Sequence, residues 1–125
     1  MSHSYKDLIV WQKSKTLASE IYRITEPFPR TEQYGLTSQI RRAAVSVASN
    51  IAEGQGRLTK GEFLQFLGHA RGSLLEVETQ LAIAVDLNYL GQADFSRLEL
   101  RISEVAKLLN GLIESLRTRV KAAGA

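Results

Sequence analysis

The feature that most constrains the fold is an unbroken heptad repeat of apolar side chains between residues 63 and 84. Side chains spaced alternately four and three residues apart fall on one stripe of an α-helix, so this stretch predicts a long helix with one buried side. Such a helix needs further helices to cover its stripe, which favours an all-α bundle. The repeat consists of Phe63, Leu67, Ala70, Leu74, Val77, Leu81 and Ala84.

Three more segments have the periodicity of amphipathic helices, and no segment alternates like a strand. We predict helices over about residues 6–26, 32–53, 59–88 and 92–120. The other expected core stripes are Val10, Leu17, Ile21, Ile24 and Phe28; Leu36, Ile40, Ala43, Val47 and Ile51; and Leu98, Ile102, Val105, Leu109, Leu112 and Leu116.

Local signals mark the ends of these helices. Pro27 cannot continue the first helix, and Gly54 and Gly56 are expected to end the second. Thr59 and Glu62 have the spacing of a capping box at the start of the third. Because the connections are short, neighbouring helices must be antiparallel. Residues 1–125 are therefore expected to form a single domain, an antiparallel up-down-up-down four-helix bundle.

Residues beside the core stripes suggest further contacts between helices or subunits. Trp11, Ala18 and Tyr22 form a second stripe on the first helix, and Arg41, Val45, Ala48 and Ala52 form a partly apolar flank of the second. Both indicate that another helix or subunit approaches there. Gly68 and Gly72 have the spacing of close helix contacts, and we interpret them first as a site of close helix or subunit contact, with surface glycines as the alternative.

The composition argues against catalysis and metal binding. The chain has no cysteine and only two histidines, and neither histidine follows a glutamate by three residues as di-iron bundles require. We found no phosphate-binding glycine loop and no nucleophile elbow. We therefore expect a protein without enzymatic activity, cofactor or metal.

Location is predicted from what the sequence lacks. The longest apolar run, residues 81–85, is far shorter than a membrane span. The first residues do not have the pattern of a secretory signal. These features, with the lack of cysteine, favour a cytoplasmic protein with no membrane contact.

Positive charge is unevenly distributed along the chain, whose net charge is +3. Residues 30–60 hold five Lys and Arg against two Asp and Glu, whereas residues 61–91 hold one against four. Basic segments attract nucleic acid, although a solvated surface is the alternative. Tyr22, Tyr34 and Tyr89 are expected at the surface, too few to predict extensive base stacking. The candidate phosphate-binding residues are Arg41, Arg42, Arg57, Lys60, Arg117, Arg119 and Lys121, the last three in a basic tail expected to fray.

Polar residues beside the apolar stripes also need an explanation. They suggest either a ligand site at the hairpin of the second and third helices or a buried hydrogen-bonded network that sets helix register, and we favour the network. Its members are Asn50, Glu53, Arg71, Ser73 and Glu78.

Several motifs together resemble a known family. They are Phe28-Pro29, Tyr34-Gly35-Leu36, Gln39 with Arg42-Ala43-Ala44-Val45-Ser46, Asn50-Ile51-Ala52-Glu53-Gly54 with Gly56-Arg57, and Ala70-Arg71-Gly72-Ser73 with Glu76. From about Tyr5 to Leu116 the chain resembles the bacterial four-helix bundle family that includes the 23S rRNA intervening-sequence proteins. That family is related to the accessory variability determinant proteins of diversity-generating retroelements. Ala48 stands where the family often has proline, and Gln33 where a basic residue is common.

The resemblance implies a four-helix bundle that assembles into a homo-oligomer, typically a homopentamer. The charge pattern together with this resemblance leaves two functions open, which differ in their partner. One is a nucleic-acid-binding oligomer that contacts RNA or DNA phosphates with little sequence specificity. The other is a protein-interaction scaffold, for example for a reverse transcriptase, that uses the acidic segment 61–91 and the apolar second stripes and binds no nucleic acid.

Overall fold

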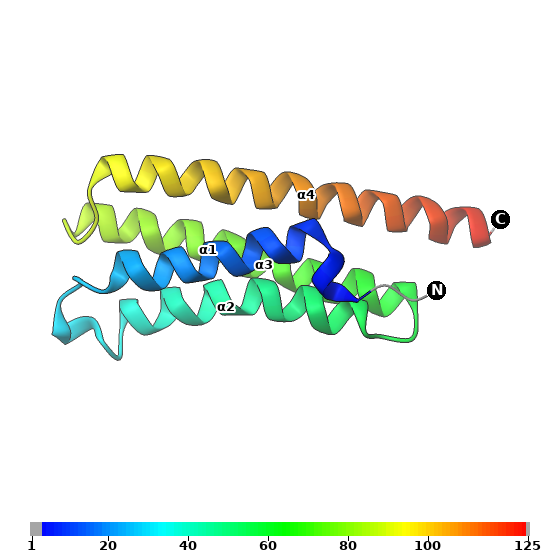
Figure 1. Cartoon of the computed structure of the whole chain (residues 1–125), viewed down its shortest axis with the longest axis horizontal. Coiled ribbons are helices and arrows are strands. Elements are labelled where there is room, and N and C mark those ends of the chain that lie inside the picture. Colours follow the sequence, from blue (N-terminus) through cyan, green and yellow to red (C-terminus); the bar gives the residue numbers. More distant parts are fainter. Residues whose placement is uncertain (1–3, 125) are drawn as a thin grey trace.

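The computed structural model describes the backbone of residues 4–124 and the side chains of residues 4–118. The described part is all-α, as predicted (Figure 1). None of its helices is long and apolar enough to cross a membrane. Its elements are the 3₁₀ turns η1 (Tyr5–Asp7) and η2 (Arg30–Glu32) and the helices α1 (Ile9–Thr25), α2 (Leu36–Gln55), α3 (Lys60–Asp86) and α4 (Gln92–Gly124).

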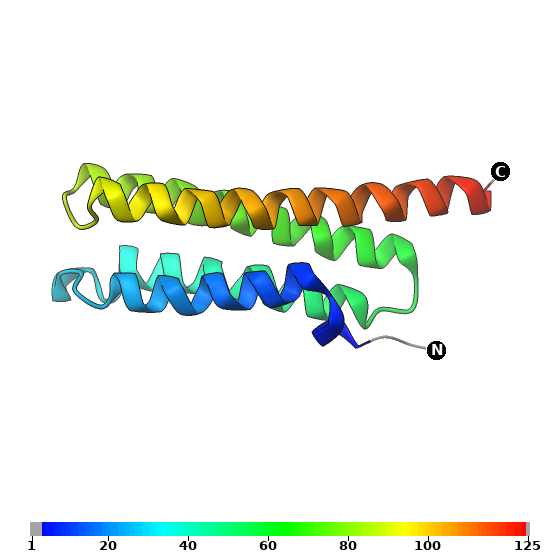
Figure 2. The ribbon, with the colours of Figure 1, turned by 45° about the horizontal axis from the view of Figure 1, so that its top comes forward.

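The four helices pack as an up-down-up-down bundle. Each packs against its sequence neighbours and α1 packs against α4, while no Cα atoms of the described residues approach within 8 Å between the diagonal pairs α1–α3 and α2–α4. Figures 1 and 2 place η1 and the last turns of α4 toward the end of the bundle that holds the α2–α3 turn. The α1–α2 connection and the α3–α4 turn lie at the opposite end. The outer side of α3 therefore faces away from α1.

The core follows the predicted stripes closely. On α3 the heptad is buried from Leu67 to Ala84, and only Phe63 at its start is half-buried. On α4 the prediction is wrong at one position, because Ile113 is buried and Leu112 is half-buried. A straight α-helix drifts by about 20° per heptad, so a second four-residue step after Leu109 keeps the stripe on the core. The backbone of α4 also continues to Gly124, beyond the predicted helix end near residue 120.

Helix α2 begins later than predicted, at Leu36 instead of about residue 32. The turn η2 precedes it, and Gly35 interrupts the helical backbone with φ −116° and ψ −116°. A Glu32 carboxylate oxygen then accepts the Leu36 amide at 3.1 Å. A Cβ at position 35 would lie 2.7 Å from that oxygen, so glycine leaves room for the Glu32 cap.

The α2–α3 hairpin depends on a glycine that does not act as predicted. Helix α2 runs through Gly54 to Gln55, so Gly54 is not the helix stop. A Cβ there would lie 2.8 Å from the Phe66 Cβ and 3.3 Å from the Phe63 carbonyl oxygen. Gly54 therefore allows close approach of α3.

The capping box at the start of α3 has one altered contact. The Thr59 hydroxyl accepts the Glu62 amide at 3.1 Å, as predicted. The Glu62 carboxylate, however, accepts the Thr59 hydroxyl at 3.1 Å instead of the Thr59 amide. The Glu62 carboxylate thus orients the Thr59 hydroxyl, which caps the first turn of α3.

Candidate nucleic-acid interface

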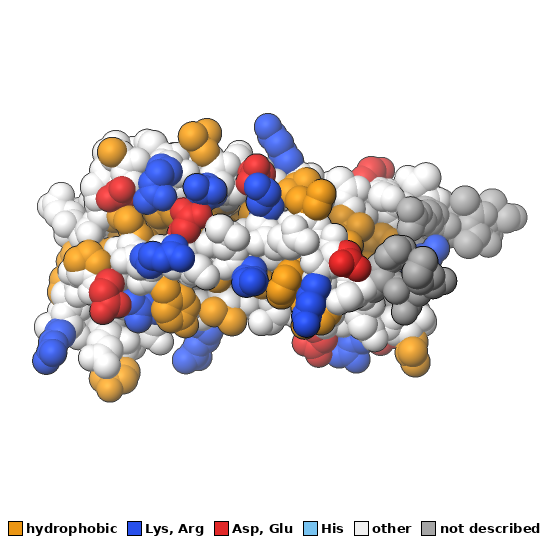
Figure 3. Space-filling model, viewed as in Figure 1, with side chains coloured by type: hydrophobic (Ala, Val, Ile, Leu, Met, Phe, Trp, Pro, Cys, Tyr) orange, Lys and Arg blue, Asp and Glu red, His pale blue; other side chains and the backbone are white. Residues whose placement is uncertain are grey.

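The predicted phosphate-binding residues do not form one surface. Two lie in the first half of α2, and the others whose side chains are described lie toward the end of the bundle that holds the α2–α3 turn. On the face shown in Figure 3, basic side chains alternate with acidic and apolar ones, without a single continuous patch. The first group is Arg41 and Arg42, and the second is Arg57, Lys60 and Arg117; the side chains of Arg119 and Lys121 lie outside the described residues.

Arg41 is occupied by contacts within the chain. Its Nε donates to the Thr25 hydroxyl at 2.8 Å, and its Nη2 donates to the Tyr22 carbonyl at 3.2 Å and to the Glu26 carboxylate at 3.3 Å. The guanidinium also lies 4.7 Å from the centre of the Tyr22 ring. Because these partners belong to the last turns of α1, where a cation is favourable, Arg41 joins α1 to α2. It is a structural residue more than a phosphate ligand.

The remaining predicted cations differ in how much of their charge is compensated. Arg57 pairs with Glu53 at 3.0 Å and lies 4.5 Å from the centre of the Phe66 ring. Arg42, Lys60 and Arg117 are exposed and make no ion pair with any side chain that the structure describes. These three retain the full charge for an external anion.

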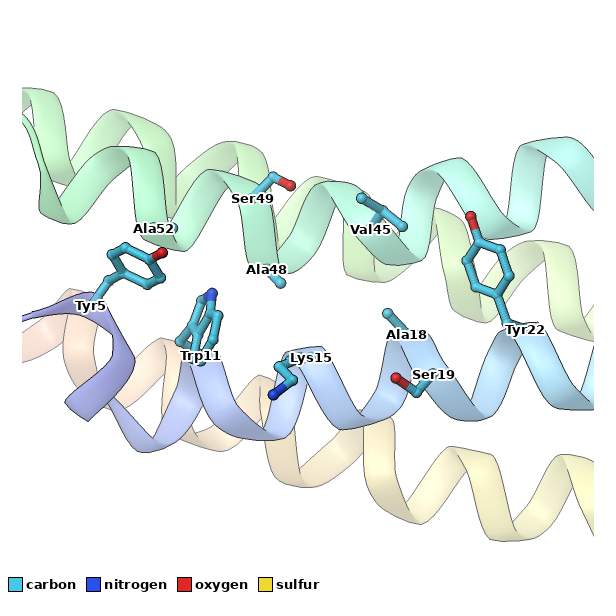
Figure 4. A pocket seen from close by; sticks show the side chains of 10 residues that line it. All are labelled: Tyr5, Trp11, Lys15, Ala18, Ser19, Tyr22, Val45, Ala48, Ser49 and Ala52. Atoms are coloured by element: carbon cyan, nitrogen blue, oxygen red, sulfur yellow. The ribbon is translucent and has the colours of Figure 1, made fainter.

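A groove of about 460 Å³ runs between the outer sides of α1 and α2. Figure 4 shows Trp11, Ala18 and Tyr22 of α1 pointing toward α2, with Val45 and Ala48 opposite them. Each stripe is predicted from sequence to meet another helix or subunit. Within the chain the two stripes face each other, so each meets a helix, and their short alanines leave the groove open. The lining is Tyr5, Trp11, Lys15, Ala18, Ser19, Tyr22, Val45, Ala48, Ser49 and Ala52.

A second pocket of about 530 Å³ continues the groove toward the start of α2. Tyr22 and Val45 belong to both hollows. Tyr34 is 91% exposed at the rim, whereas Thr37 is only 7% exposed and its hydroxyl has no partner among the described residues. The lining, called the Tyr34 pocket below, is Tyr22, Gln33, Tyr34, Thr37, Ser38, Arg41, Arg42 and Val45.

The two hollows share a chemistry that the sequence did not reveal. They contain three cations, Lys15, Arg41 and Arg42, and no Asp or Glu lines either one. Four of the five Tyr and Trp residues of the chain line them. Lys15 lies 5.5 Å from the centre of the Trp11 ring, so cations and aromatic faces are already adjacent. Flat rings beside positive charge are suited to a ligand that carries both bases and phosphates.

The predicted polar network is wrong as a single buried set. Ser73 and Ser46 are 2.9 Å apart, and Asn50 donates to the Ser46 hydroxyl at 2.9 Å and to its carbonyl at 2.8 Å. Glu53 and Arg71 are instead exposed. Glu53 pairs with Arg57, Arg71 donates to Asn110 at 3.2 Å, and Glu78 is half-buried on α3.

Beside this serine pair lies a polar pocket of about 290 Å³ on the α3 side of α2. Arg42 lines it as well as the Tyr34 pocket, and Glu76 contributes a carboxylate. A negative group at the wall makes this pocket a poorer place for phosphate than the groove on the α1 side.

The outer face of α3 is open and almost without charge. A Cβ at Gly68 or Gly72 would meet nothing within 4 Å, so neither glycine serves a close helix contact within the described chain. Leu75 is 59% and Ile83 43% exposed on the same side. This stripe, called the α3 outer face below, is Gly61, Gly68, Gly72, Leu75, Thr79, Ala82 and Ile83.

Comparison with known proteins places the chain in a family. No curated protein matches it. A solved structure from Bacteroides thetaiotaomicron VPI-5482, described as a protein with unknown function from the S23 ribosomal protein family, is 23% identical with a TM-score of 0.75. The match covers 84% of this chain and 98% of that one, and it shows the fold. The model of the 23S rRNA-intervening sequence protein family matches residues 6–111, and the chain belongs to this family.

Proposed function

We propose that the protein is a non-enzymatic, homo-oligomeric bundle of the cytoplasm that binds RNA or DNA through the α1–α2 groove. The observation that carries this proposal is the lining of the groove and the Tyr34 pocket, which combines four aromatic rings with Lys15, Arg42 and the internally paired Arg41, and has no carboxylate in its wall. All of these residues except Tyr5 lie within the segment that matches the family. The cations of the C-terminal tail lie beyond it, so we assign them a supporting role.

The binding is expected to be electrostatic and weakly selective. Phosphate contacts position a nucleic acid without reading its sequence, and their strength falls as salt rises. Arg42 makes no ion pair with the described side chains, so it can bind a phosphate without breaking an existing interaction. Lys60 and Arg117 can extend the contact at the other end of the bundle.

The nucleic-acid proposal is tested with protein purified through high-salt and nuclease washes. Labelled single- and double-stranded RNA and DNA are titrated at two salt concentrations. Micromolar or tighter binding that weakens steeply with salt is expected. Arg42→Glu should weaken binding and lower the salt slope by about 1, whereas Lys107→Glu, an equal charge change on α4, should not. Equal effects of both variants would overturn the groove as the binding surface.

We assign the α3 outer face to contacts between copies in a homo-oligomer, which the family resemblance suggests is a pentamer. An uncharged stripe of small and apolar residues favours close helix packing. Residues 61–91 are also net negative while residues 30–60 are net positive, so opposite charges are available on two different surfaces of each copy. Contacts between unlike surfaces generate rings.

Light scattering tests this assembly. The unmodified protein should have a mass several times that of one chain. Leu75→Glu should lower that mass, whereas Leu100→Glu, a matched change at a 74% exposed leucine of α4, should leave it unchanged. If the unmodified protein and both variants have the mass of one chain, the proposed homo-oligomer is wrong.

A second function uses the same α3 outer face without nucleic acid. A scaffold for a protein such as the reverse transcriptase of a retroelement is supported by the apolar residues of this face, by the acidic residues of the segment 61–91 that lie outside it, and by the resemblance to retroelement accessory proteins. Calorimetry with a purified, nuclease-treated reverse transcriptase measures whether the two proteins bind directly without nucleic acid. Binding that Leu75→Glu removes and Arg42→Glu does not would favour the scaffold.

A further inference from the structure

We propose that the Tyr34 pocket binds one unpaired nucleotide of a single strand, with the base on the Tyr34 ring and the phosphate at Arg42. This inference rests on the proposed function and names the ligand of one part of the groove. A pocket of about 530 Å³ falls within the range of about 300–1,000 Å³ usual for small-molecule sites.

Tyr34 provides the stacking surface. Its side chain is 91% exposed, and its ring makes no contact with another aromatic ring or a cation among the described side chains. The neighbouring Tyr22 differs, because the Arg41 guanidinium already lies on its ring. Every base has a flat face, so an uncovered ring next to a cation is a general platform for unpaired bases.

Thr37 provides the independent observation. A threonine in a helix usually donates its hydroxyl to the carbonyl four residues earlier. That residue is Gln33, which precedes the interruption at Gly35, and the Thr37 hydroxyl is left without a partner although the residue is only 7% exposed. A buried hydroxyl without a hydrogen bond is unfavourable. Because Thr37 lines the pocket, a small rotation of its side chain on binding would expose the hydroxyl to a ribose hydroxyl or a base edge.

Arg42 provides the charge for the phosphate. It is exposed and makes no ion pair with the described side chains. The start of α2 adds little, because the Glu32 carboxylate already caps the Leu36 amide there. Arg41 is held by Thr25 and Tyr22, so it shapes the wall without having to move.

The chemistry selects a single strand over a duplex. Stacking on Tyr34 requires a base whose face is exposed, and base pairs within a duplex cover each other. The groove continues from the pocket to Lys15 and Trp11, which offers nucleotides farther along the strand a second cation and a second ring.

The main experiment measures binding of labelled oligo(U), oligo(dT) and a duplex of equal length. Tyr34→Ala should weaken single-strand binding by about 5- to 150-fold, the range of a base–aromatic stack, and Tyr34→Phe should retain it. Duplex binding should change less than twofold. Leu58→Ala removes a 98% exposed apolar side chain at the other end of α2 and serves as the control. Loss of single-strand and duplex binding to the same extent would overturn the pocket.

Thr37→Val separates folding from binding. It removes the hydroxyl without a partner, so we expect a Tm equal to or above that of the unmodified protein together with weaker single-strand binding. Unchanged affinity would overturn the role of Thr37 in the pocket.

A mononucleotide distinguishes failure of the pocket from failure of the proposed function. Uridine monophosphate is titrated into ¹⁵N-labelled protein, and amide shifts at Tyr34, Thr37 and Arg42 are expected. Such shifts without strand binding would retain the pocket and overturn the general function. Strand binding that is insensitive to Tyr34→Ala, with no shifts, would overturn only the pocket.

Discussion

The two flanks of α2 carry similar small residues but meet their neighbours in opposite ways. Toward α3, Gly54 brings the two helices into close contact, and Ser46 and Ser73 are hydrogen-bonded. Toward α1, Ala48 and Ala52 line an open groove. A small side chain therefore creates either contact or space, depending on whether the neighbouring backbone comes close.

Bulky groups account for the separation on the α1 side. Trp11 occupies the groove near the end of α2. Near the start of α2, the Arg41 guanidinium lies between that helix and the Tyr22 ring. We infer that these two contacts keep α1 from closing onto the alanines. On the α3 side no comparable group intervenes at Gly54. The same helix thus gives a packed interface on one side and an open groove on the other.

The largest expected effect tests the packed flank. Gly54→Ala should lower the free energy of unfolding by about 1–3 kcal/mol, because the new Cβ would lie 2.8 Å from the Phe66 Cβ. Gly56→Ala is the control, since a Cβ there meets only ordinary contacts of 3.6 Å or more. Urea denaturation followed by circular dichroism measures both. Equal stability of the two variants would contradict the close approach at Gly54.

Two adjacent arginines are expected to differ in role, Arg41 in stability and Arg42 in binding. Arg41→Met should lower the free energy of unfolding by about 1–2 kcal/mol, because the Thr25 hydroxyl and Tyr22 carbonyl lose a donor. Arg42→Met should change it by less than about 0.5 kcal/mol. RNA affinity at low salt should show a marked loss for Arg42→Met. If Arg42→Met lowers the free energy of unfolding more than Arg41→Met does, the structural role given to Arg41 is wrong.

Glycines on α3 should respond in the opposite direction from Gly54. For the dissociated chain, Gly68→Ala should raise the free energy of unfolding by about 0.5–1 kcal/mol, because alanine favours a helix and its Cβ meets nothing within 4 Å. The measurement is made at a dilution where light scattering gives the mass of one chain. A loss of stability at that dilution would show that the α3 outer face is not open.

The smallest effect concerns the end of the bundle beside the Tyr34 pocket. The Tyr89 hydroxyl donates to Glu32 at 3.0 Å, and this hydrogen bond, with burial and the Glu32 charge, raises the pKa of Tyr89 above 10.0. The folded state thus holds the proton more tightly, so this stabilisation is complete below pH 10 and is lost as pH rises further. Tyr89→Phe should lower Tm slightly at neutral pH. The difference from the unmodified protein should narrow above pH 10, and a constant difference would exclude Glu32 as the cause.

Prediction from sequence succeeded where one helix suffices to define the pattern. The heptad of α3 and the Thr59 cap depend on spacing along the chain, and both are present. It was less accurate where two elements meet. The core position at Ile113 depends on how straight α4 is, and the start of α2 depends on the Glu32 cap beside Gly35.

The candidate site shows the same limit. Arg41 and Arg42 are equivalent as sequence, but α1 supplies partners for only one of them. Tyr22 and Tyr34 were expected at the surface, and both line one pocket, whereas Tyr89 is half-buried against Glu32. Spacing along one helix carries no information about which side chains of another helix lie opposite.

The sequence by itself determined the all-α class, the number of helices and the family, because periodicity and motifs are properties of a single chain segment. The tertiary structure alone decided which small residues close an interface and which leave a groove. It also decided which cations are already paired. Those outcomes depend on distances between helices, and such distances result from packing of the whole bundle.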